Sequence, residues 1–145
     1  MFSASSVWLI GDPSDAFARL AVAIEEAGGQ PHRLNPTESA RWRARVRAGE
    51  YEGPLPNLLI VDARLAYGHP DRHLEELLAT PPWMFLPLVV LAHRPDAQAC
   101  ARAYAEGAAA WITLPRDPEA LGAHLEHIAR YWIKTAVLPE ITLPL

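Results

Sequence analysis

The sequence is poor in cysteine, in long apolar runs and in positive charge, and each shortage excludes a class of protein. Its one cysteine, Cys100, leaves the 145-residue chain without an internal disulfide, which excludes a disulfide-stabilised secreted scaffold and fits a reducing compartment. No apolar run approaches the roughly 20 residues of a membrane helix. The 13 basic side chains are outnumbered by 17 acidic ones, giving a net charge of −4, whereas nucleic-acid binding normally needs a basic excess.

The beginning of the chain also lacks the basic and apolar segments of a secretory signal peptide. We therefore expect a cytoplasmic protein that binds neither membrane nor nucleic acid. The length suits a single domain, and 50% of the residues are hydrophobic, which is enough for a sizeable core.

What the sequence does have is a regular alternation of short apolar and longer amphipathic segments. We predict five strands, at 6–10, 32–34, 58–62, 87–91 and 109–113. We predict five helices, at 15–28, 36–48, 72–79, 97–106 and 118–132, with Ser14 or Asp15, Asp71 and Asp96 as caps. Such alternation implies right-handed crossovers and hence an α/β fold, a flavodoxin-like doubly wound parallel sheet of five strands in the order 2-1-3-4-5.

The strand at 58–62 lies at the centre of this pattern. The run Leu-Leu-Ile-Val at 58–61 is apolar throughout, as in a parallel strand buried on both faces, and Asp62 follows it. In open α/β sheets, ligands bind outside the carboxyl ends of the strands. Asp62 is therefore the leading candidate for a functional carboxylate.

The spacing of the strand ends carries a resemblance to a known family. Asp62 ends the third predicted strand, Ala92 follows the fourth thirty positions later, and Leu114 and Pro115 follow the fifth. The segment Arg-Ala-Tyr-Ala-Glu-Gly-Ala at 102–108, followed by Trp-Ile-Thr-Leu-Pro at 111–115, adds a local match. Over nearly its whole length the chain resembles a response-regulator receiver domain of the CheY-like type.

The end of the chain resembles a narrower group within that family. Tyr131 and Trp132, followed by Leu138 and Pro139, resemble the tail of single-domain regulators that partner phytochrome-type sensor kinases. We therefore divide the chain into a receiver domain, 1–133, and an apolar tail, 134–145. The tail packs either on its own domain or on a second copy, which would give a homodimer through the fourth helix, the fifth strand, the fifth helix and the tail.

For an active member, the resemblance implies phosphoryl transfer from a kinase histidine to Asp62. Two acids after the first strand help to hold Mg²⁺, a Ser or Thr after the fourth strand bonds the new phosphoryl group, and a Lys after the fifth strand offsets its charge. Here the hydroxyl position is Ala92 and the Lys position is Leu114. The acid pair reads Gly11 and Asp12, which leaves one carboxylate, or, on a shifted alignment of the shortened loop, Asp12 beside Asp15. Asp12 and Asp62 remain as candidate Mg²⁺ ligands, and we expect no cofactor to be required.

Other residues near the site have two interpretations each. Arg64 or Arg116 either places a guanidinium over the site in compensation or is simply solvated. Trp111 is either the switch aromatic of the family or a side chain packed at a strand end. The resemblance further implies a cis peptide bond between Leu114 and Pro115.

The remaining clusters have structural interpretations. Because the total charge is acidic, we interpret a group of arginines as a solvated helix face: Arg41, Arg43, Arg45 and Arg47. Two histidine pairs have spacings that can chelate a metal, but no cysteine or clustered carboxylate completes either set, so we interpret them as structural or surface residues: His69 with His73, and His124 with His127. Cys100 is expected to be a buried, inert thiol.

We therefore expect an atypical receiver, not an enzyme, that acts in two-component (phosphorelay) signal transduction as a protein-interaction module with impaired phosphorylation. Its partner is a sensor histidine kinase or another signalling protein. The alternative is a competent receiver that is phosphorylated on Asp62. A third alternative, a small-molecule-binding flavodoxin-like domain, has no phosphate-cradling loop to support it.

Overall fold

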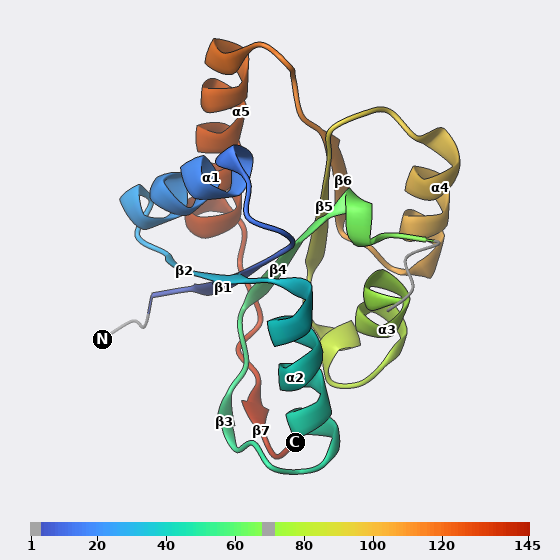
Figure 1. The fold of residues 1–145 in the computed structure, drawn as a ribbon. Helices are drawn as coiled ribbons and strands as arrows, with labels where there is room; N and C mark the ends of the chain where they lie inside the picture. The colour runs from blue at the N-terminus through green and yellow to red at the C-terminus, as the bar shows by residue number, and fades with distance from the viewer. Residues whose placement is uncertain (1–3, 68–71) are drawn as a thin grey trace.

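Five parallel strands form the central sheet of the computed structural model, which describes residues 4–67 and 72–145 (Figure 1). The strands are β1 (Ser6–Ile10), β2 (Gln30–Leu34), β4 (Leu58–Asp62), β5 (Leu88–Ala92) and β6 (Ala110–Thr113). Their order is β2-β1-β4-β5-β6, and every neighbouring pair is parallel. The predicted order 2-1-3-4-5 is confirmed, because β4, β5 and β6 are its third, fourth and fifth strands.

Five α-helices accompany these strands: α1 (Asp15–Glu26), α2 (Pro36–Arg47), α3 (His73–Ala79), α4 (Ala97–Glu106) and α5 (Pro118–Arg130). Four of them begin at a side chain that accepts a hydrogen bond from the backbone N–H three residues later: Ser14, Asn35, Asp96 and Asp117. The predicted cap Asp71 lies outside the described residues. After Arg130 the chain continues as a π-helical turn, Tyr131–Thr135 (η3), where α-helix was predicted through residue 132. Within the described ranges, no helix has both the length and the apolar character needed to cross a bilayer.

Helices cover both faces of the sheet (Figure 1). The helices α1 and α5 pack on one face, in an apolar cluster that includes Leu9 and Ile60. The helices α2, α3 and α4 pack on the other face, around Trp8 and Val61. Because successive strand residues point to opposite faces, a strand covered on both sides is apolar along its length. All five residues of β4 are accordingly buried, and Asp62 is buried with them.

Arg43 on α2 corrects the interpretation of the four arginines as a solvated face. Its side chain is only 3% exposed, forms an ion pair with Glu76 of α3 and contacts His73. Arg47 pairs with the same carboxylate from a more exposed position. The helical pattern could not reveal this, because the acid that draws Arg43 inward lies 33 positions further along the chain.

The fourth helix corrects the interpretation of Cys100. Ala103 is the residue of α4 that is fully buried against the sheet, whereas Cys100 is partly exposed.

The tail packs on its own domain. The short strand β7 (Thr142–Leu143) pairs antiparallel with β3 (Gly53–Pro54), a ladder that the sequence did not predict. Asn57 anchors the approach to it: its side chain accepts a hydrogen bond from the N–H of Ser6 at 2.7 Å and donates one to the carbonyl of Pro139 at 2.9 Å. This is one of the two alternatives left open for the tail. The homodimer stays a prediction.

Candidate functional site

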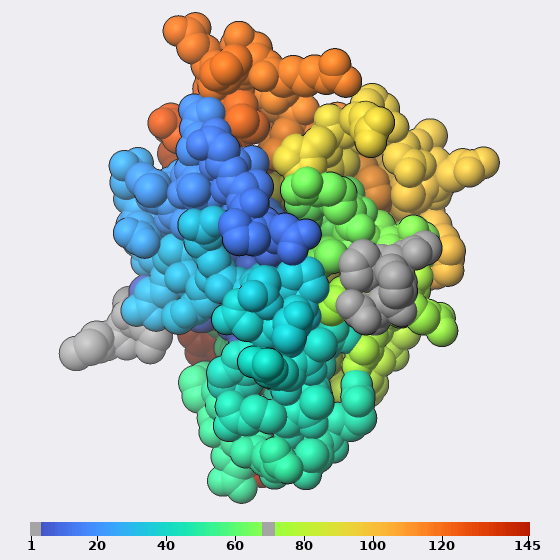
Figure 2. Space-filling model, viewed as in Figure 1, coloured from blue at the N-terminus to red at the C-terminus, as the bar shows by residue number. Residues whose placement is uncertain are grey.

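Asp62 lies at the carboxyl edge of the sheet, where the segments that follow β1, β4 and β5 meet on one face of the molecule (Figure 2). Gly11 and Asp12 follow β1, and His93 follows β5. Phe17 comes from the first turn of α1. These residues converge because parallel strands all end at the same edge of a sheet.

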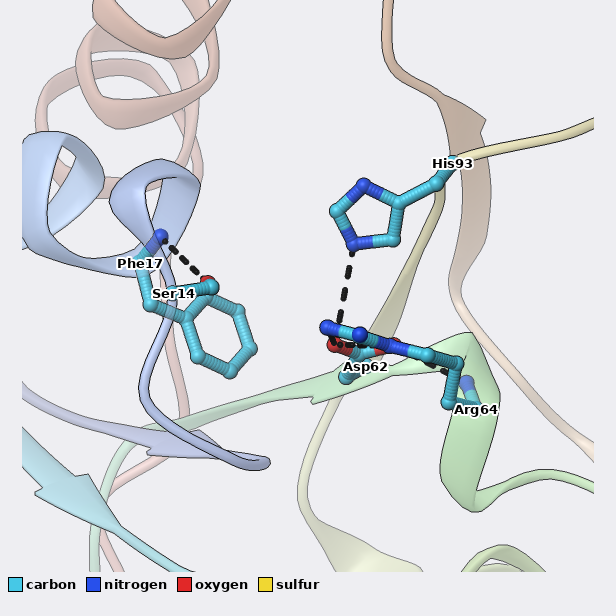
Figure 3. A network of polar contacts seen from close by, with 5 residues as sticks. All are labelled: Ser14, Phe17, Asp62, Arg64 and His93. Atoms are coloured by element: carbon cyan, nitrogen blue, oxygen red, sulfur yellow. Dashed lines mark hydrogen bonds and ion pairs between the residues drawn. The ribbon is translucent and has the colours of Figure 1, made fainter.

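Both oxygens of the Asp62 carboxylate are held by Arg64 (Figure 3). The backbone N–H of Arg64 donates to Oδ1 at 2.9 Å, which makes Asp62 the cap of the short 3-10 helix Ala63–Leu65 (η1). The guanidinium then lies across the carboxylate, with Nη2 at 2.6 Å and Nε at 3.1 Å from Oδ2. Asp62 is 3% exposed and Arg64 is 62% exposed, so the arginine covers the carboxylate from the solvent side.

The charge state of Asp62 follows from these contacts. Burial by itself would raise the pKa of the carboxyl, but the side-chain and backbone hydrogen bonds from Arg64, together with its charge, outweigh burial and hold the pKa of Asp62 below its usual value. His93 adds a smaller effect of the same sign, with Nε2 3.6 Å from Oδ2. The hydrogen bond to Asp62 in turn raises the pKa of Arg64. Asp62 is therefore an ionised carboxylate paired with a cation at neutral pH.

Gly11 and Phe17 fill the side of the site where the family carries its first acid. A Cβ at position 11 would lie 2.8 Å from Cε2 of Phe17 and 2.9 Å from Cβ of Asp62, which is closer than real Cβ atoms approach. The Phe17 ring is buried, and its backbone N–H donates to the capping Ser14 (Figure 3). The amphipathic pattern of α1 predicts that Phe17 is buried, but nothing in it predicts a ring beside Asp62.

Ala92 and Leu114 stand at the hydroxyl and Lys positions and bring neither group to the site. They are neighbours, since the N–H of Leu114 donates to the carbonyl of Ala92 at 2.7 Å. Both are buried, and Leu114 belongs to the apolar cluster that α1 and α5 share. The side chain of Leu114 therefore packs in the core, and the cation that contacts the carboxylate of Asp62 is Arg64.

The predicted cis bond between Leu114 and Pro115 is wrong. Among the described residues, the cis peptide bonds precede Pro82 and Pro144. An X-Pro bond favours trans by about 0.5–1 kcal/mol on its own. Here Leu114, the residue before Pro115, packs in the core.

Trp111 packs at the end of β6. It contacts the apolar cluster under α2, α3 and α4, and its backbone N–H donates to Oη of Tyr104 at 3.0 Å. It also lines a cavity of about 530 Å³ together with Tyr67 and Ala92. These contacts fit the interpretation of a packed side chain, and the switch alternative stays a prediction.

Of the two arginines considered for the site, Arg64 is the one that reaches it. Arg116 lines a neighbouring cavity of about 380 Å³ with His93 and Leu114. Within the described residues it forms no hydrogen bond to Asp62. The sequence holds one signal for this contact: Arg64 follows Asp62 by two residues, and the carboxylate of Asp62 can cap the turn that contains Arg64.

The residues around Asp62 do not fit a divalent cation in this arrangement. Mg²⁺ requires an octahedron of oxygen ligands, whereas both Asp62 oxygens face Arg64, Gly11 has no carboxylate and Asp12 is exposed. Nowhere in 4–67 or 72–145 do three or more His, Cys, Asp or Glu side chains gather so that they could hold a metal ion. A Mg²⁺ site at Asp12 and Asp62 stays a prediction, and it requires Arg64 to move aside.

Several solved structures with the same fold are response regulators. The Mn²⁺-bound form of response regulator Rcp1 matches with a TM-score of 0.75 and 17% identity, over 93% of this chain and 99% of that one. The phosphorylated cyanobacterial phytochrome response regulator RcpA matches with 0.73 and 21%, over 94% and 99%. RPA3017, a response regulator in red light signalling of R. palustris, matches with 0.63 and 17%, over 92% and 98%. No family model and no curated protein matches this chain.

At these identities the likeness establishes the fold. The expected resemblance to CheY-like receiver domains, including phytochrome-associated ones, is confirmed at that level. The chemistry of Asp62 has to be argued from the residues of this chain, because one fold can carry many functions.

Proposed function

We propose that this chain, which has the fold of response-regulator receiver domains, is an atypical receiver of two-component signal transduction. It works as a protein-interaction module without enzymatic activity, and phosphorylation of Asp62 is impaired. The observation that carries the proposal is the ion pair of Asp62 and Arg64: a guanidinium binds both oxygens of the carboxylate that would have to attack a phosphoryl donor.

The missing partners of Asp62 explain why phosphorylation is impaired. The transfer would form a bond between a carboxylate oxygen and phosphorus and break the bond from phosphorus to the leaving group of the donor. Its transition state is loose and strongly anionic, so positioned cations and donors supply most of the catalysis. Ala92 and Leu114 supply neither. Each missing charge-assisted hydrogen bond costs about 1.5–3 kcal/mol, and two together slow the transfer at least about a hundredfold.

Arg64 also fixes the electrostatic state of the module. The buried carboxylate of Asp62 is paired with the guanidinium of Arg64. A receiver whose site does not change charge has to convey information through what its surface binds.

The elements proposed for that surface carry exposed apolar side chains. Tyr104 on α4 is 49% exposed, Tyr131 is 52% exposed, and Val137 in the tail is 98% exposed. Exposed apolar side chains of this size favour protein contacts. We infer a cytoplasmic module that binds a sensor histidine kinase or another signalling protein, that binds no nucleic acid, and that forms a homodimer through α4, β6, α5 and the tail.

A competent phospho-acceptor is the second candidate. It is supported by the lowered pKa of Asp62, because an ionised carboxylate is the nucleophile that the transfer needs. It requires Arg64 to release the carboxylate and then to act as the cation that Leu114 does not supply.

Incubation with acetyl phosphate and Mg²⁺, followed by intact-mass measurement and peptide mapping, tests the proposal. We expect a small fraction of the wild-type chain to gain a phosphate, and none of the Asp62→Asn variant. The combined change Ala92→Thr with Leu114→Lys restores the hydroxyl and the cation, so it is expected to raise the phosphorylated fraction.

Adding Arg64→Ala to that pair is expected to raise the fraction again, whereas Arg116→Ala, the matched control, is not. Stoichiometric labelling of Asp62 in the wild-type chain would overturn the proposal in favour of the competent receiver.

A further inference from the structure

Three of the five tryptophans gather away from the carboxyl edge of the sheet. The ring centroid of Trp8 in β1 lies 5.7 Å from that of Trp42 in α2 and 5.3 Å from that of Trp83 in the 3-10 helix Trp83–Phe85 (η2). Tyr51 packs edge-on against Trp42, with 5.2 Å between centroids. We name these four residues the aromatic cluster. Nothing in the chemistry of Asp62 uses them.

The aromatic cluster borders a cavity of about 630 Å³. Residues of β1, β2 and α2 line it, together with Leu138 and residues 140–142 of the tail. It lies towards the amino ends of the strands, where Ser6 and Asn57 are among the lining residues. Figure 1 shows β3 and β7 beside α2 at the end of the molecule that holds the C-terminus. The volume falls in the range of about 300–1,000 Å³ typical of small-molecule sites.

Backbone hydrogen bonds hold this cavity in shape. The N–H of Leu55 donates to the carbonyl of Ile141 at 2.8 Å, and the β3–β7 ladder continues from there. Asn57 fixes Pro139 on the other side. These hydrogen bonds fix the tail at the edge of the cavity. A ligand would therefore bind a site that is already ordered, which lowers the entropic cost of binding.

The lining selects for positive charge. Among the described residues that line the cavity there is one carboxylate, Glu140, and one histidine, His32, and no Lys or Arg is present. Aromatic rings present negative faces, which attract cations and stack with flat ring systems. Arg45 already uses Trp42 in this way, with Cζ 4.7 Å from the ring centroid, although Arg45 does not line the cavity.

We propose that the cavity beside the aromatic cluster binds a planar aromatic cation, which stacks on Trp42 and faces the carboxylate of Glu140. The site needs no residue around Asp62. If the cavity binds no such cation, the proposed signalling function is therefore unaffected. If the signalling function is disproved, the proposed binding site is likewise unaffected.

Proflavine, a flat tricyclic cation, is the probe. In an isotope-labelled sample the five tryptophans give five indole N–H resonances, which single Trp→Phe variants assign. We expect saturable binding of one proflavine that shifts the resonances of Trp8, Trp42 and Trp83 and leaves those of Trp111 and Trp132 in place. Equal shifts in all five, or no shift at millimolar proflavine, would overturn the proposal.

Two variants and an anionic analogue test the chemistry of the site. Glu140→Gln, an exposed change, is expected to weaken proflavine binding about three- to fivefold, as for a surface ion pair. Glu126→Gln on α5 makes the same charge change elsewhere and is expected to have no effect. Trp42→Leu is expected to weaken binding more than tenfold, with circular dichroism checking the fold. Equally tight binding of 2-anthracenesulfonate, or full affinity in Glu140→Gln, would contradict the assignment of a cation.

Discussion

Single side chains around Asp62 act through their size as well as their charge. Gly11 leaves room for the Phe17 ring, and any Cβ there would collide with Phe17 and with Asp62. A change of Gly11 back to the acid of the family would therefore push a buried ring out of the core before it could provide a ligand for Mg²⁺. The differences from the family all meet at Asp62, since Gly11 leaves room for Phe17 beside it and Arg64 binds its carboxylate.

Arg64→Ala is predicted to destabilise the protein at neutral pH. Arg64 is mostly exposed, so the loss is expected to be about 1–2 kcal/mol, below that for a fully buried pair. In the wild type the lowered pKa of Asp62 gives stability that is present above the unfolded pKa and is lost as pH falls through the folded pKa. Without Arg64, burial dominates and raises the pKa of Asp62. On acidification the carboxylate is therefore protonated in the folded variant, which removes the cost of a buried unpaired charge and reduces the loss of stability.

Urea denaturation between pH 7 and pH 4 measures this effect. The difference in unfolding free energy between wild type and Arg64→Ala should shrink as pH falls. Arg116→Ala, an exposed arginine of the same edge, should show almost no difference at any pH. A constant difference for Arg64→Ala across that range would mean that the ion pair is not its source.

At the scale of elements, local sequence signals predicted where helices begin, but they did not predict contacts between segments that are far apart in the sequence. Asn35 and Glu38 form a reciprocal capping box at the start of α2, which short-range chemistry determines. The β3–β7 ladder joins segments about ninety positions apart, and its two-residue strands carry no periodic pattern of their own. Arg43 and Glu76 were missed for the same reason, because their partnership exists only after α2 and α3 have docked.

Asn57→Ala is predicted to loosen the tail. The substitution removes both side-chain hydrogen bonds of Asn57, to Ser6 and to Pro139, at a cost of about 1–3 kcal/mol. Hydrogen exchange should then be faster at the amide of Leu55, which donates to Ile141 in the tail. Gln98→Ala, an exposed change on α4, serves as the control. Unchanged protection of Leu55 would show that the ladder alone holds the tail.

The whole molecule presents three separate regions. The carboxyl edge holds Asp62 under Arg64, the cavity with the aromatic cluster lies towards the amino ends of the strands, and α4, β6 and α5 carry the surface proposed for protein contacts. The tail packs on its own domain, and the large apolar side chains that it leaves exposed are Val137, at 98%, and Leu145, at 77%.

Val137→Asp combined with Tyr131→Asp is predicted to convert the proposed homodimer into a monomer. Both side chains are exposed, so the fold should tolerate the change, while each subunit brings two charges into the interface. Light scattering at several concentrations gives the mass. Val22→Asp, an exposed apolar position on α1, is the matched control. A wild-type chain that is monomeric at all concentrations would remove the dimer from the proposal.

The sequence by itself determined the fold, because a parallel sheet follows from the alternation of buried runs with amphipathic helices. The carboxyl end of each of the five strands of the central sheet lies within one residue of its predicted position. It also placed Asp62, Ala92 and Leu114 at that edge, since position along a strand fixes them. Only the tertiary structure decided what surrounds the carboxylate. Arg64 folds back onto Asp62, Phe17 occupies the space beside Gly11, and the tail lines a cavity. These contacts depend on packing in three dimensions and produce no periodic pattern in the sequence.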